Sequence, residues 1–136
     1  MRKNLRFPVM EAGISIFISL TIFALAAPTT LNIMAIHNLR CATREVVTDM
    51  ESTRFLALDR NQTFRIDFNA GTYQIIRVSD NSIFKIRSLE DYNVQTTKTS
   101  ITFSNRGSSS SGVVTLSNGL ATKSIKVNRL GRFITS

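Results

Sequence analysis

Residues 7–28 read FPVMEAGISIFISLTIFALAAP, and this stretch decides how the chain is organised. Its only charged residue is Glu11, and the uncharged run that follows, 12–36, is 25 residues long. A helix rises about 1.5 Å per residue, so this run reaches roughly 37 Å and can cross a hydrocarbon core of about 30 Å. The residues before it favour a cytoplasmic N-terminus because three are basic: Arg2, Lys3 and Arg6. The sequence therefore predicts one membrane-spanning helix, with the rest of the chain outside the cytoplasm.

Glu11 needs a partner, because a carboxylate in an apolar helix is costly in lipid unless it is paired. A basic leader, Phe7, Glu11 four residues later and Pro28 within the apolar helix together resemble the N-terminus of type IV pilins and pseudopilins. The resemblance implies that a prepilin peptidase cuts between Arg6 and Phe7 and methylates the new amine. The family carries Gly before the cut, where this chain has Arg6.

The same resemblance implies that Glu11 pairs with the N-terminal amine of a neighbouring subunit, and that the helix bends at Pro28. A buried carboxylate and a buried ammonium are each expensive alone, and together they neutralise one another and fix the register between subunits. A proline removes a backbone donor and clashes with the carbonyl four residues back, which predicts a kink near Ala24.

Two other interpretations of this helix stay open. A plain transmembrane anchor would not require Glu11. A cleaved secretory signal would fit the A-x-A pattern of residues 24–26. Against the signal, the apolar run continues through Ile36 and an acid lies just upstream of it.

Composition limits the possible chemistry. The 136 residues allow one domain plus a tail, and a formal net charge of +8 makes the chain basic. Cys41 is the only cysteine, so no disulfide can close within the chain, and we expect it to pack on a helix face. The single histidine, His37, has no partners at metal-ligand spacing. We find no catalytic constellation, and therefore expect neither an enzyme nor a cofactor or metal site.

A second helical pattern follows the apolar run. Apolar and small residues recur every three or four positions, which indicates one face of an amphipathic helix that ends around residues 59–61. The face consists of Leu39, Ala42, Val46, Met50, Thr53 and Ala57.

From Gln62 the period changes to two, which indicates strands. Residues 63–68 alternate cleanly, with the aromatic and branched side chains on one face. Further strands are expected at 72–78, 83–86, 100–103, 113–116, 120–127 and 132–135. Asn118-Gly119 predicts a tight hairpin turn with positive φ at both positions. The Gly/Ser segment 105–112 has no apolar side chain to pack, so we expect a mobile loop.

The C-terminal segment GVVTLSNGLATKSIKVNRLGRF, residues 112–133, resembles the end of the GspH/FimT pseudopilin family. Together with the N-terminus, it implies an α+β fold: a long, kinked N-terminal helix packed on an antiparallel β-sandwich. The expected parts are a leader (1–6), a transmembrane assembly helix (7–37), and an amphipathic helix with a β domain (38–136).

Basic residues gather after Asp91, where no acid occurs. On the strand at 120–127, alternation places Lys123 on the more apolar face, near an exposed strand end. Basic ridges attract phosphate in a salt-dependent way. Some FimT members are DNA-uptake receptors with a Gly-Arg-x-Arg motif; Gly131-Arg132-Phe133 matches it, but Ile134 replaces the second Arg. The candidate DNA-binding residues are Lys123, Lys126, Arg129 and Arg132; a solvated basic surface is the alternative.

We therefore expect a minor pilin or pseudopilin, a structural subunit of a type IV pilus or a type II secretion pseudopilus. Its partners would be other pilin subunits, prepilin peptidase and the bacterial inner membrane, and its alternative role would be binding double-stranded DNA during natural transformation. A membrane-anchored exported domain unrelated to filaments is the third hypothesis.

Overall fold

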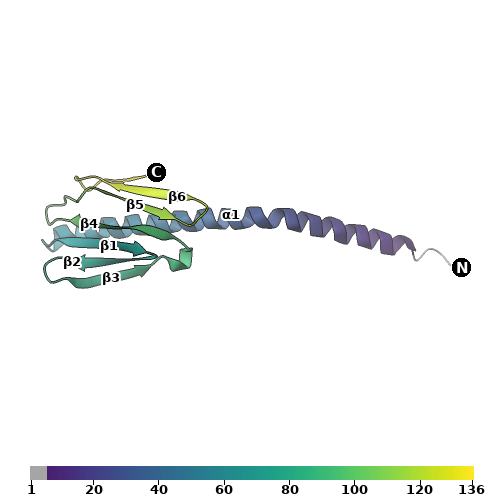
Figure 1. Cartoon of the computed structure of the whole chain (residues 1–136), viewed down its shortest axis with the longest axis horizontal. Helices are drawn as coiled ribbons and strands as arrows, with labels where there is room; N and C mark the ends of the chain where they lie inside the picture. Colours follow the sequence, from purple (N-terminus) through teal and green to yellow (C-terminus); the bar gives the residue numbers. More distant parts are fainter. Residues whose placement is uncertain (1–5) are drawn as a thin grey trace. The chain divides into compact units, whose positions relative to one another are not determined.

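The structure is a computed structural model that describes the backbone of residues 6–136 and the side chains of residues 8–25 and 30–136 (Figure 1). Most of the predicted leader, residues 1–6, lies outside the described part. By their internal contacts the residues form two compact units, one ending at Met34 and one comprising Ala35–Ser136.

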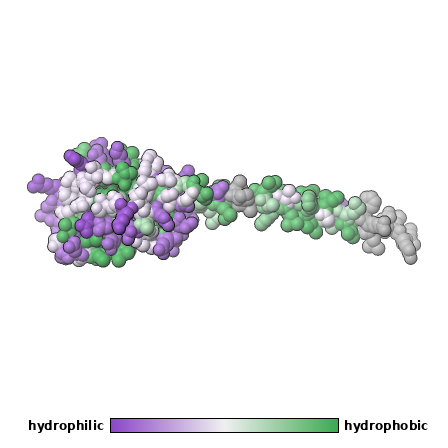
Figure 2. Space-filling view, in the orientation of Figure 1, coloured by the Kyte–Doolittle hydropathy of each residue, from purple (hydrophilic) through white to green (hydrophobic). Residues whose placement is uncertain are grey.

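One α-helix, α1, spans Arg6–Asp59. All described side chains up to Met34 are exposed, and Figure 2 shows that apolar residues, in green, make up most of the coloured surface of this segment. Hydroxyl groups in this segment donate hydrogen bonds to backbone carbonyls one turn earlier. Ser15, for example, donates to the Glu11 carbonyl over 3.0 Å. Within the described residues, α1 is the one helix long and apolar enough to cross a membrane, judged by length and composition. The backbone is helical through Pro28, and the predicted kink stays a prediction.

The C-terminal part of α1 belongs to the second unit and supplies part of its core. The predicted amphipathic face is confirmed, because each of its six residues is at most 1% exposed. The predicted helix end near residue 59 is also confirmed. The face packs against apolar side chains from the strands, including Phe64, Ile66, Ile101 and Ile125.

Seven antiparallel strands form the rest of this unit, in the order β3-β2-β1-β4-β5-β6-β7. Their bounds are β1 Phe64–Ala70, β2 Thr72–Arg77, β3 Ser82–Ser88, β4 Gln95–Phe103, β5 Gly112–Ser117, β6 Thr122–Val127 and β7 Phe133–Thr135. The segment at 89–93, which carries no clear sequence pattern, contains the short 3-10 helix η1 (Glu90–Tyr92). The alternation predicted for residues 63–68 is confirmed, since Phe64, Ile66 and Phe68 are buried.

The predicted fold class is confirmed as a long N-terminal helix packed on antiparallel strands. The strands form one connected sheet in which β4 meets β5 through only two residue pairs, Gln95↔Ser117 and Thr96↔Leu116. In contrast, β1 and β4 pair along most of β1. The narrow junction lets β1–β4 and β5–β7 diverge on either side of α1, as Figure 1 shows.

The hairpin of β5 and β6 differs from its prediction in the turn. Ser117 pairs with Thr122, so four residues connect the strands, and of the predicted turn pair only Gly119 has positive φ (84°). The Asn118 side chain accepts hydrogen bonds from the Leu120 and Ala121 amides, at 3.1 and 2.9 Å. The expected connection of three residues, 117–119, with positive φ at Asn118 is wrong, because this side chain organises a longer turn.

The Gly/Ser segment 105–112 was expected to be mobile, but hydrogen bonds fasten it. Ser109 donates from its hydroxyl to the Asn128 carbonyl over 2.6 Å and from its amide to the Arg129 carbonyl over 3.0 Å. Gly107 and Ser109 are both buried. Polar side chains and the backbone therefore hold a segment that lacks apolar side chains.

Candidate functional site

The N-terminal half of α1 carries the predicted assembly residues. Glu11 is exposed on the helix, and no side-chain partner for it occurs among the described residues. Arg6 is the first residue of α1 and Phe7 the second, while the side chains of Phe7 and Pro28 lie outside the described part.

A buried carboxylate joins α1 to the sheet. Asp49 is 5% exposed; the Tyr73 hydroxyl donates to its Oδ2 over 2.7 Å, and the Lys85 ammonium to its Oδ1 over 2.8 Å. Arg87 reaches both Asp49 (3.4 Å) and Glu45 (2.9 Å). Strands β2 and β3 therefore dock on one polar stripe of α1 through charge-assisted hydrogen bonds.

The surroundings of this carboxylate shift two pKa values. Burial alone raises the pKa of Asp49, but the hydrogen bonds from Lys85 and Tyr73 and the nearby cations outweigh it, so the pKa lies below its ordinary value. Burial and the hydrogen bond to Asp49 raise the pKa of Tyr73. Asp49 is therefore ionised and Tyr73 neutral at physiological pH, so Asp49 accepts the hydrogen bond from Tyr73 and pairs with Lys85 as a carboxylate.

At the opposite end of the second unit from Ala35, Arg54 clamps two loops. Its guanidinium donates to the carbonyls of Gly107, Gly131 and Leu130 at 3.0, 2.9 and 3.2 Å. The turn held in this way, residues 128–132, also carries a hydrogen bond from the Asn128 amide to the Arg132 carbonyl (3.0 Å). We call this region the Arg54 end.

Exposed cations surround the clamp. Arg129 and Arg132 lie in the fastened turn, Arg106 lies in the adjoining loop, and Lys126 lies on the outer face of β6 two residues before the turn. The structure thus brings together three of the four predicted DNA-binding residues. Lys123 does not join them, because it faces the other side of β6.

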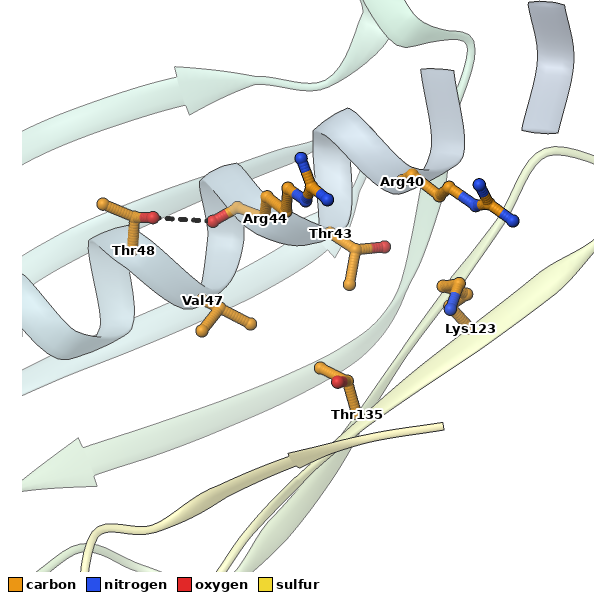
Figure 3. Close-up of a pocket in the computed structure, with 7 residues that line it drawn as sticks. All are labelled: Arg40, Thr43, Arg44, Val47, Thr48, Lys123 and Thr135. Carbon is orange, nitrogen blue, oxygen red and sulfur yellow. Dashed lines mark hydrogen bonds between the residues drawn. The ribbon is translucent and has the colours of Figure 1, made fainter. Parts of the chain in front are cut away.

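Lys123 instead lines a pocket between α1 and the β6–β7 hairpin (Figure 3). The pocket has a volume of about 560 Å³. Its lining has three cations and no acid: Arg40, Thr43, Arg44, Val47, Thr48, Lys123 and Thr135. The prediction that Lys123 sits near an exposed strand end is confirmed, since it is the second residue of β6 and half-buried.

The sequence did not reveal three of these features. Arg54 and Asp49 were visible only as charges on the helix, and their partners lie 24 to 77 residues away along the chain. The i, i+4 spacing of Arg40 and Arg44 is apparent in the sequence, but the strand that faces them is not. No group of three or more metal-ligating side chains occurs among the described residues.

Comparisons with known proteins identify a matching family and similar folds. The family described as "Type II transport protein GspH" matches residues 42–131. The type IV minor pilin FimU of Pseudomonas aeruginosa has a similar fold, with a TM-score of 0.60, 13% identity, and coverage of 72% of this chain and 87% of FimU. The minor pseudopilin EpsH of the Vibrio cholerae type 2 secretion system also has a similar fold, with a TM-score of 0.60 and 7% identity. The match covers 73% of this chain and 96% of EpsH.

A search of curated proteins finds no significant match to the sequence. The family match nevertheless covers most of the second unit, and both solved structures share its helix-on-sheet arrangement. This chain therefore belongs to the GspH family of type IV pilin-like proteins.

Proposed function

We propose that this protein is a minor pilin or pseudopilin, a structural subunit that assembles into a type IV pilus or a type II secretion pseudopilus through its N-terminal helix. The observation that carries the proposal is the described first part of α1, where every side chain from Pro8 to Leu25 is exposed and Glu11 is the only charge. The family match and the two similar folds support a pilin-type subunit.

In this proposal the chain has three parts: a leader (1–6), an assembly helix (7–37) and a globular part (38–136). The apolar helix holds the protein in the inner membrane with the globular part outside the cytoplasm. Prepilin peptidase removes the leader before Phe7. Glu11 then pairs with the N-terminal amine of a neighbouring subunit, and helices of neighbouring subunits replace lipid around it.

The test is Glu11→Ala in the native bacterium, with Ser15→Ala as the matched control one helical turn away. We expect the Glu11 variant to stay in the membrane and to fall at least about tenfold in sheared filaments, because an unpaired ammonium would be buried at each junction. Ser15→Ala should enter filaments normally. If Glu11→Ala entered filaments at the wild-type level, Glu11 would have no role in assembly and the proposal would be disproved.

N-terminal mass analysis of the protein taken from membranes tests the processing step separately. A mature chain that begins at methylated Phe7 is expected. An intact Met1 would show that Arg6 prevents cleavage, and a start at Ala27 would indicate a secretory signal instead.

A second candidate function is binding of double-stranded DNA, favoured by the exposed cations at the Arg54 end. Phosphate contacts there would be salt-dependent. We expect Arg132→Glu to weaken DNA binding by the full chain in detergent about tenfold at low salt. Lys98→Glu, the same charge change at an exposed site on β4, is the control. Equal DNA retention by both variants would rule out a receptor role for this turn.

A further inference from the structure

The pocket lined by Arg40, Arg44 and Lys123 carries a positive charge that no described residue balances with an ion pair. None of these three side chains takes part in an ion pair or side-chain hydrogen bond within the described residues. Arg40 and Arg44 are one helical turn apart, a spacing at which like charges destabilise a helix. An anion bound between α1 and β6 would offset this repulsion.

The polar groups of the pocket suit an anion with several oxygens. Thr43 and Thr48 already donate their hydroxyl protons to backbone carbonyls, at 2.7 and 2.8 Å. The remaining donors are the two guanidinium groups and the ammonium, with the exposed Thr135 hydroxyl beside them. Figure 3 shows Arg40 and Lys123 on opposite walls at the same end of the pocket. Two or three cations around one site fit a phosphate group.

The position of the pocket along α1 favours a lipid headgroup as the source of that phosphate. Arg40 follows Ile36, the last residue of the uncharged run, by four residues, or about 6 Å of helix. The headgroup layer beyond the hydrocarbon core is roughly 5–7 Å thick on each side. Arg40 therefore lies at the depth of lipid phosphates when Ile36 marks the outer edge of the hydrocarbon core.

A second contact places the sheet at the same depth. Asn118, in the turn between β5 and β6, donates from its side chain to the Ala35 carbonyl over 2.8 Å. Ala35 is the penultimate residue of the uncharged run. The neighbouring Leu120 is 67% exposed, so this turn presents an aliphatic side chain level with the end of the apolar helix.

We propose that this pocket binds the phosphate of an anionic phospholipid headgroup, which seats the globular part on the outer face of the inner membrane before the subunit is extracted. The inference rests on the proposed function only in requiring that the apolar run spans the membrane. It gives Arg40, Arg44 and Lys123 a role that is independent of the basic turn at the Arg54 end.

The test is native mass spectrometry of the full chain in non-ionic detergent, titrated with phosphatidylglycerol and with phosphatidylcholine. We expect phosphatidylglycerol to bind at least about tenfold more tightly, since each basic residue near an anionic surface adds to the attraction. Arg44→Gln combined with Lys123→Gln should abolish this preference. The control, Lys126→Gln with Arg132→Gln, removes the same charge elsewhere and should keep it. Thermal unfolding checks that each variant is folded, and Arg40→Gln alone provides an independent variant.

Three results would overturn the proposal. The first is equal binding of both lipids by the wild type. The second is an unchanged lipid preference in the pocket variants; if those variants also fail to enter filaments, the pocket receives a carboxylate of a neighbouring subunit instead. The third is binding of inorganic phosphate in the pocket without any lipid preference, which would identify free phosphate as the ligand. Because no filament forms in detergent, failure of the assembly proposal at Glu11 would leave this measurement unaffected.

Discussion

At the scale of single residues, Gly131 is the position where backbone and packing together require glycine. Its φ is 71°, and a Cβ atom there would lie 2.6 Å from Arg54 Nε and 2.9 Å from the Gly107 carbonyl oxygen. We expect Gly131→Ala to lower the free energy of unfolding by about 2–3 kcal/mol, because it adds the loss of the Arg54 clamp to the left-handed strain. Chemical denaturation of the full chain in detergent, followed by circular dichroism, measures this.

Gly119 provides the control for that prediction. Its φ is 84°, but a Cβ atom there meets nothing within 4 Å. Gly119→Ala should therefore cost only the backbone strain, about 1 kcal/mol. If the two variants lose equal stability, the close approach of Arg54 to Gly131 contributes nothing.

Asp49 makes the stability of the protein depend on pH. Its folded-state pKa lies below the ordinary value of 3.8, so folding favours the ionised form. This stabilisation is present above about pH 4 and is lost as the pH falls through the folded-state pKa. We expect Asp49→Asn to cost about 2 kcal/mol at pH 7 and to flatten the stability curve below about pH 4. The amide has one acceptor oxygen in place of two, so Lys85 and Tyr73 cannot both donate to it, and the charge that pairs with Lys85 is lost. Denaturation between pH 2.5 and 7 tests both effects.

Asp67 is the comparison for Asp49. It pairs with Arg65 at 2.9 Å, but both side chains are about a third exposed. An exposed ion pair contributes at most about 1 kcal/mol, so Asp67→Asn should change stability little. Equal losses from Asp67→Asn and Asp49→Asn would contradict the structural role of the buried cluster.

At the scale of elements, the C-terminal part of α1 has one face buried in the core and one face exposed. Met50 is fully buried, whereas Phe55 is 68% exposed on the same helix. We expect Met50→Ala to lower the free energy of unfolding by about 2–4 kcal/mol through the cavity it leaves, and Phe55→Ala to change it by less than about 0.5 kcal/mol. Thermal unfolding measures the stability of both variants. A large loss of stability in Phe55→Ala would contradict the exposed position of Phe55 on α1.

The loop between β4 and β5, which the sequence predicts to be mobile, is fastened by hydrogen bonds, and this can be measured directly. The amides of Ser109 and Ser110 donate to the Arg129 and Thr102 carbonyls, at 3.0 and 2.9 Å. Hydrogen exchange should therefore be slow at these two amides and fast at Ser111, whose amide has no backbone acceptor among the described residues. Uniformly fast exchange from 105 to 112 would restore the picture of a mobile loop.

At the scale of the whole molecule, every buried core residue among the described side chains lies at or after Leu39. The segment up to Met34 contributes none of them, and its described side chains are exposed. We expect a fragment of residues 35–136 to fold in water with nearly the same unfolding midpoint as the full chain in detergent, because its core is intact. Circular dichroism and thermal unfolding test this, and a fragment without a cooperative transition would show that the apolar segment is needed for folding.

The sequence reveals elements whose signal is local, and misses contacts between distant residues. The helix face from Leu39 to Ala57 and the alternation of Phe64, Ile66 and Phe68 are periodic, and periodicity follows from the geometry of one element. The turn at Asn118 was predicted as too short because the dipeptide Asn-Gly does not reveal that the side chain would bond two amides beyond it. Of the predicted site residues, Lys126, Arg129 and Arg132 lie at the same end of the second unit because they are close along the chain.

By itself the sequence determined the apolar helix with its single acid, the amphipathic continuation of that helix and the positions of most strands. It did so because hydrophobic period and charge are properties of consecutive residues. Only the tertiary structure decided that Arg54 fastens two loops, that Asp49 is buried among donors, and that Lys123 lines a pocket with Arg40 and Arg44. Those arrangements depend on which strands pair and where α1 crosses them, and both are set by burying one common core.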